Sequence, residues 1–220
     1  MSRRARGETR GDLRERVLAA SRALLEAEGP GALSMREVAR RAGVTHQAPY
    51  HHFPDKESIL AELVARAFDE LADVLREVLD RPQTGDVWSV ALQTGLGYVR
   101  FALRHPGLYR VMFRPELVNM QRFPAAEASS ERAHAQLQRL VAVLGQPGDP
   151  GVQATLHWSI VHGLACLLVD GALGKKLGAT SAQEAHVEAV LRMFAVGTAG
   201  SGRAPRPSGQ PRRKPGRAKR

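Results

Sequence analysis

Residues 34–56 read SMREVARRAGVTHQAPYHHFPDK, and this stretch decides the fold of the chain. Ser34 can cap a helix, and Glu37, three residues later, completes the pattern of a capping box. Gly43 ends this short helix, because glycine adopts the left-handed backbone at little cost. Thr45 is placed to cap a second short helix over residues 46–52. Two short helices joined by a glycine turn predict a helix-turn-helix, whose second helix enters the major groove of DNA.

The second short helix has almost no apolar side chains to bury. Its sequence is HQAPYHH, and a helix so polar is expected at the surface. Its side chains have the hydrogen-bonding groups that read bases and phosphates, and Ala48 can contact a thymine methyl group. Two short helices around a glycine also occur in ordinary helical bundles. The polarity of residues 46–52 favours DNA binding.

Residues 9–63 resemble the N-terminal DNA-binding domain of TetR-family transcriptional regulators. The resemblance rests on the Val38-Ala39 and Ala42-Gly43-Val44-Thr45 steps and on the run Tyr50-His51-His52-Phe53-Pro54-Asp55-Lys56-Glu57. It implies that Tyr50 and Lys56 hold phosphates while the start of the second helix reads bases. Pro49 departs from the family, in which many members have Leu, Ile or Thr at this position. The candidate DNA-binding residues are Arg36, Thr45, His46, Gln47, Ala48, Tyr50, His51 and Lys56.

The pattern of apolar residues predicts an all-α fold of about nine helices, with no alternating strand pattern. Besides the two short helices, helices are expected at residues 12–28, 56–79, 87–104, 108–113, 126–144, 152–173 and 181–196. The loop at residues 82–86 predicts a boundary. It separates a helix-turn-helix domain over residues 11–63, with a linking helix to about 80, from a helical domain over residues 87–196.

The chain carries a formal net charge of +10, which indicates a polyanionic partner. Much of this charge lies at the ends. Residues 198–220 contain eight basic residues and no acidic one, and residues 197–220 are expected to be a disordered basic tail. Residues 1–10 form a basic arm. Each terminus is either simply solvated or adds contacts to DNA phosphates.

A second resemblance covers most of residues 87–196. Residues 95–113 and the run Trp158-Ser-Ile-Val-His162-Gly163 resemble the C-terminal domain of a TetR subgroup with a Trp-His-Gly signature. The resemblance implies a homodimer formed by helices 152–173 and 181–196, and a pocket for a small-molecule effector. Residues of these types at helical spacing are more often packed core than pocket. The candidate pocket residues are Phe101, Tyr109, Met112, Phe113, Trp158 and His162.

The sequence gives no positive support for catalysis, a metal site or a cofactor. Cys166 is the one cysteine, so no intrachain disulfide forms. No signal peptide is visible, and a cytoplasmic location is expected. We therefore expect a dimeric transcriptional regulator, a repressor that a small molecule releases from a near-palindromic operator. The alternatives are a nucleic-acid-compacting protein that binds through its basic tail, and an all-helical enzyme whose head is merely structural.

Overall fold

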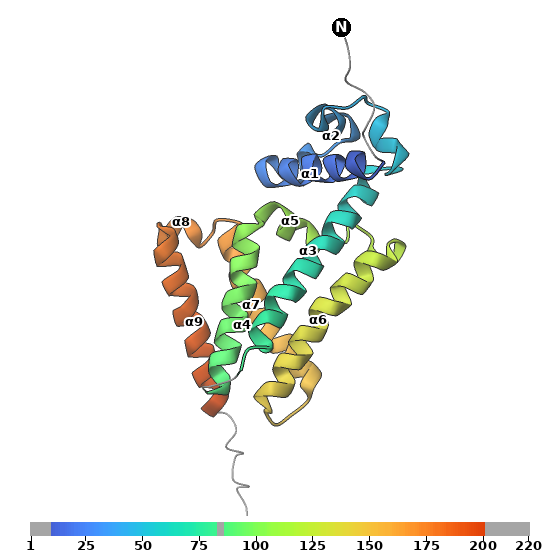
Figure 1. The fold of residues 1–220 in the computed structure, drawn as a ribbon. Coiled ribbons are helices and arrows are strands. Elements are labelled where there is room, and N and C mark those ends of the chain that lie inside the picture. Colours follow the sequence, from blue (N-terminus) through green and yellow to red (C-terminus); the bar gives the residue numbers. More distant parts are fainter. Residues whose placement is uncertain (1–9, 83–85, 201–220) are drawn as a thin grey trace, which may run out of the picture.

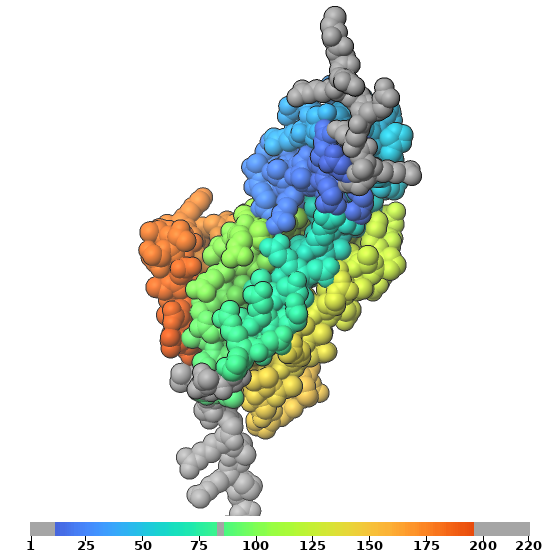
Figure 2. Space-filling model, in the orientation of Figure 1, coloured from blue at the N-terminus to red at the C-terminus, as the bar shows by residue number. Residues whose placement is uncertain are grey.

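The computed structural model describes residues 10–82 and 86–200, and within these ranges every regular element is helical (Figure 1). The described part contains nine α-helices, which confirms the predicted all-α fold. A small head stands at one end of a longer body of roughly aligned helices. Figure 2 shows the head as a distinct lobe above the body.

The head consists of α1 (Arg10–Glu28), α2 (Met35–Ala42), the first turns of α3 (Lys56–Leu79), and the 3₁₀ turns η1 (Pro30–Ala32) and η2 (Ala48–His51). Ser34 caps α2, because its hydroxyl accepts a hydrogen bond from the Glu37 amide at 3.2 Å. Gly43 ends α2 with a φ of 66°, as predicted. Within the described residues, the reciprocal capping box occurs at α3, between Asp55 and Ser58, and not at α2.

The prediction of a second short α-helix over residues 46–52 is wrong. Residues 46–52 contain only the four-residue 3₁₀ turn η2, held by bonds from Ala48 N–H to Thr45 O and from Tyr50 N–H to Gln47 O. Pro49 explains the difference, since it has no N–H to donate in the α-helical pattern. Thr45 does not cap this turn; Gln47 takes the N-cap position without a side-chain bond.

The body is built around α3, which enters it from the head. It contains α4 (Val87–Arg104), α5 (Pro106–Met112), η3 (Met120–Arg122), α6 (Pro124–Leu144), α7 (Pro150–Val169), α8 (Gly174–Leu177) and α9 (Thr180–Gly200). Helix α7 ends at Val169, earlier than predicted, because the chain turns at Gly171 with a φ of 78°. Helix α9 continues to Gly200, so residues 197–200 are helical and not part of a disordered tail. The remainder of the predicted tail and residues 1–9 of the basic arm lie outside the described residues.

Head and body are joined where α1 meets α5. The Glu26 carboxylate accepts hydrogen bonds from the amides of Gly107 at 2.7 Å and Leu108 at 3.2 Å. It thereby places a negative charge at the positive N-terminal end of α5. Gly107 allows this approach, because a Cβ there would lie 2.3 Å from the Leu25 carbonyl oxygen.

A second link at this junction involves His105. Arg22 can only donate, so its 3.0 Å contact makes His105 Nδ1 an acceptor. The other ring nitrogen, Nε2, then donates to Glu70 of α3 at 2.7 Å. The His105 ring, which lies between α4 and α5, thus links Arg22 of α1 to Glu70 of α3.

Helix α7 is only partly buried in the single chain. By length and composition it could cross a membrane, although core helices of soluble proteins pass the same test. One face is open to solvent in the single chain. It contains Val152, which is 68% exposed, Leu156, which is 45% exposed, and Leu167, which is 51% exposed. Gly163 lies on the same face and has open space beside its Cα.

Candidate nucleic-acid interface and cavity

The head presents a polar surface around η2. Six predicted DNA-binding residues in this segment and at the start of α3 are exposed, and they are Thr45, His46, Gln47, Tyr50, His51 and Lys56. Ala48 is half-buried. Pro49 is buried and attaches the turn to the head core. The predicted residues therefore share one surface segment even though their backbone is a 3₁₀ turn.

The rings of His46 and Tyr50 lie together at the tip of this surface, with centroids 5.9 Å apart. Lys56 is the first residue of α3, where the amides of a helix start favour an anion. A phosphate near Lys56 would meet both the ammonium group and this partial charge. The segment thus combines exposed polar side chains with a position suited to an anion.

The arginines of α2 differ in their availability. Glu37 accepts hydrogen bonds from Arg40 and then Arg41, and these bonds lower its pKa to about 2. Arg41 also pairs with Glu28. Arg36 is exposed and forms no ion pair within the described part of the chain. Its charge is thus free to meet a phosphate, whereas those of Arg40 and Arg41 are largely compensated.

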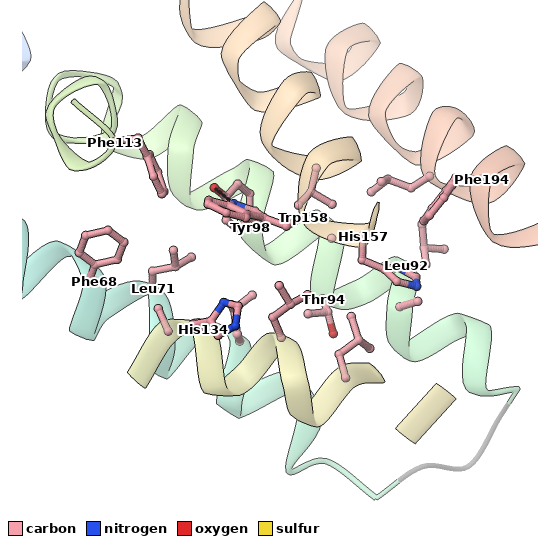
Figure 3. Close-up of a pocket in the computed structure, with 18 of the residues that line it drawn as sticks. Phe68, Leu71, Leu92, Thr94, Tyr98, Phe113, His134, His157, Trp158 and Phe194 are labelled. Atoms are coloured by element: carbon pink, nitrogen blue, oxygen red, sulfur yellow. Dashed lines mark hydrogen bonds between the residues drawn. The ribbon is translucent and has the colours of Figure 1, made fainter. Parts of the chain in front are cut away.

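The body encloses a cavity of about 230 Å³ between α3, α4, α6, α7 and α9 (Figure 3). Three of the six predicted pocket residues line it: Met112, Phe113 and Trp158. Phe101 does not, because it is 1% exposed in the core and packs on the His105 ring at 5.2 Å. Tyr109 and His162 lie behind the cavity wall.

Tyr109 and His162 belong to a partly buried polar network. The two tyrosine hydroxyls contact His162 Nδ1, Tyr109 at 2.8 Å and Tyr98 at 3.0 Å. Trp158 Nε1 donates to the Tyr98 hydroxyl at 3.4 Å. Burial raises the pKa of Tyr98 to about 12 and also raises that of Tyr109. Burial lowers the pKa of His162, so the network is uncharged near neutral pH.

Sequence reasoning missed most of the cavity wall. The missed residues come from several helices and include Phe68, Leu71, Leu75, Leu92, Thr94, Tyr98, His134, His157 and Phe194. The apolar stripe of residues 56–79 marks a buried face, but such a stripe packs equally well against side chains or a cavity. Figure 3 shows the wall closing from α3 and α6 on one side and α7 and α9 on the other.

Two family models match the chain in separate parts. The model described as "Bacterial regulatory proteins, tetR family" matches residues 17–63, which include most of the head. The model described as "Tetracyclin repressor-like, C-terminal domain" matches residues 91–194, which include most of the body. The two matches follow the division into head and body.

Individual proteins share limited sequence identity with the chain. The nucleoid occlusion factor SlmA of Vibrio vulnificus is 32% identical over 108 residues, which are 48% of this chain and 54% of SlmA. The chain therefore spans about half the length of that relative. An uncharacterised HTH-type transcriptional regulator of Mycobacterium tuberculosis is 25% identical over 161 residues, 73% of this chain and 72% of that protein.

A solved structure of a Rhodococcus sp. RHA1 protein with unknown function superimposes with a TM-score of 0.71. It is 26% identical and covers 90% of this chain and 100% of its own. The arrangement of head and body is thus shared with a structure determined independently.

Proposed function

Because the chain belongs to the TetR family of DNA-binding transcriptional regulators, we propose that it is a homodimeric repressor released from its operator by a small molecule. We place the DNA contacts at the η2 surface, Arg36 and Lys56, and the effector in the cavity of the body. The repressor acts in the cytoplasm and needs no cofactor.

The observation that carries this proposal is the path of α3. Its first residue, Lys56, is exposed beside η2, where we propose the DNA contacts, while Phe68, Leu71 and Leu75 of the same helix line the cavity. A ligand that moves the cavity wall therefore acts on the helix that positions the head. To release DNA, the ligand must bind the DNA-incompetent arrangement more tightly than the other.

Two observations support a dimer. The exposed face of α7 has an apolar stripe, and Met193 of the neighbouring α9 is 76% exposed. Such a stripe is typical of a surface that another chain covers. The two-fold symmetry would place two η2 surfaces in successive major grooves, about 34–36 Å apart.

The dimer is tested by Leu156→Asp, measured by sedimentation equilibrium. The variant is expected to sediment as a monomer and to lose operator affinity, because two heads no longer bind together. Val143→Asp is the matched control, since Val143 is 41% exposed on α6 and does not belong to the apolar stripe of α7. A Leu156→Asp variant that remains dimeric would place the interface elsewhere.

Release by an effector is tested by footprinting. The protein is expected to protect a near-palindromic site on genomic DNA at moderate salt, and an inducing compound should remove the protection. Protection of no discrete site would contradict the repressor proposal.

The basic tail supports a second candidate, a nucleic-acid-compacting protein, because residues 198–220 contain eight basic residues. Deleting these residues separates the two functions. A repressor keeps its sequence preference, with weaker binding and a shallower dependence on salt. A compacting protein loses its DNA binding altogether.

A further inference from the structure

The wall of the cavity is built from uncharged side chains and two histidines. Within the described residues, no Lys, Arg, Asp or Glu side chain lines it. Most lining residues are aliphatic or aromatic, and Phe68 of α3, Phe194 of α9 and Phe113, just after α5, contribute rings. An ion bound here would leave water without meeting an opposite charge, which is far costlier than burying a neutral polar group.

The polar groups of the wall are mostly paired already. Thr94 donates its hydroxyl proton to the Val90 carbonyl at 2.8 Å. Trp158 and Tyr98 bind each other in the network described above. These side chains fix the shape of the wall, and a ligand does not need to supply hydrogen-bond partners for them.

Among the buried polar side chains of the wall, His157 is the exception. Its side chain is 5% exposed, and its Nε2 atom is buried without a hydrogen-bond partner in the described part of the chain. The ring packs edge-on against Phe194, with centroids 5.1 Å apart, and Figure 3 shows it beside Leu92 in the wall. Burial lowers its pKa, so the imidazole is neutral near pH 7. Buried polar atoms are almost always paired, so this nitrogen at the cavity wall is a position where a bound molecule would gain a hydrogen bond.

Two surface hollows adjoin the cavity and carry opposite charges. One shares Met120 and Ser130 with the cavity and contains Glu127 and Glu131. The other shares Met112, Phe113, Met120 and Trp158 with it and contains Arg114. The surroundings therefore favour neither sign of charge, and the preference for an uncharged ligand comes from the wall itself.

We infer that the cavity takes an uncharged, largely apolar molecule with one hydrogen-bonding group, which pairs with His157 Nε2. This inference rests on the proposed role of the cavity as the effector site and adds the chemical class of the ligand. The neutral imidazole offers one nitrogen, which donates to a carbonyl or ether oxygen in one tautomer and accepts from a hydroxyl in the other.

Four probes of similar size test the ligand class: 2-phenylethanol, ethylbenzene, phenylacetate and phenethylammonium. The readout is tryptophan fluorescence of the full-length dimer without DNA, because both tryptophans of the chain, Trp88 and Trp158, line the cavity. The alcohol is expected to bind saturably, and both charged probes at least about 100-fold more weakly.

The role of His157 is tested by His157→Phe. The alcohol should bind this variant about 3- to 10-fold more weakly, as expected for one lost hydrogen bond. The affinity for ethylbenzene should stay within about twofold, which excludes a collapsed cavity. His186→Phe is the matched control, because His186 lies on α9 outside the cavity wall.

The ligand class is overturned if either charged probe binds within tenfold of the alcohol, or if none of the four changes the fluorescence. It is also overturned if His157→Phe weakens the alcohol and ethylbenzene equally. Operator anisotropy reports the proposed function separately. Binding of the alcohol without DNA release would support the ligand class and count against effector release. Tight binding of a charged probe with DNA release would support effector release and count against the ligand class.

Discussion

Replacing Gly107 by alanine tests how tightly the head is attached to the body. The new Cβ would lie 2.3 Å from the Leu25 carbonyl oxygen and 2.8 Å from Glu26 Cα. Both are backbone atoms of α1, so no side-chain rotation relieves the contact. Helix α5 must move away by about 1 Å to restore ordinary van der Waals distances. That movement stretches the hydrogen bonds from Gly107 and Leu108 to Glu26 beyond useful length.

The expected cost has two parts. Forcing a methyl group into a packed contact costs about 1–3 kcal/mol. Weakening two hydrogen bonds to a carboxylate adds about 1–2 kcal/mol. We therefore expect Gly107→Ala to lower the free energy of unfolding by about 2–5 kcal/mol.

The assay is urea denaturation followed by far-UV circular dichroism. Gly31→Ala is the control, because a Cβ at Gly31 meets nothing within 4 Å. The free energy of unfolding of this control should change by less than about 0.5 kcal/mol. A Gly107→Ala variant with the wild-type midpoint and slope would refute the reasoning and mean that α1 and α5 are not in close contact in solution.

Three further predictions follow from other parts of the molecule. Lys56→Ala should weaken operator binding and reduce the slope of log affinity against log salt by about one, measured by fluorescence anisotropy; an unchanged slope would exclude a phosphate contact. Tyr98→Phe removes a hydroxyl bonded to Tyr109, His162 and Trp158. It should cost about 1–3 kcal/mol in urea denaturation, and a neutral result would mean that the network is not formed. Burial lowers the folded-state pKa of His157 and His162 from the ordinary value of 6.5. The unfolded chain therefore binds more protons below about pH 6.5, and stability should fall from there down to the lowered pKa values. The fall should be smaller in His157→Asn, and a pH-independent urea midpoint would contradict the assignment.

Local signals in the sequence predict the long helices well. The Asp55 cap and the Pro-Gly breaks define residues 56–79 and 87–104 with the bounds that the structure shows. These boundaries depend on neighbouring residues alone. At residues 46–52 the polarity of the side chains correctly predicts an exposed segment, but Pro49 lacks the N–H that an α-helix needs there, and the chain forms a 3₁₀ turn instead.

The cavity could be predicted only in part. An apolar residue such as Phe101 looks the same in sequence whether it faces a void or another side chain. The crossing of α3, α4 and α9 decides this, and crossings are not visible in helical periodicity. His157 shows the limit most clearly, since its isolation depends on Phe194, 37 positions away in the chain. The DNA-binding residues stay predictions, placed on one surface but not yet tested against DNA.

The shared core has a consequence for exchanging parts between relatives. One contiguous hydrophobic cluster contains Val17 and Val38 of the head together with Leu96 and Leu191 of the body. A chimaera cut after residue 63 would sever α3 inside this cluster. A functional graft of a new head must carry Glu26 and meet a glycine at position 107. The head can therefore be exchanged between relatives only together with the surface of the body that it contacts.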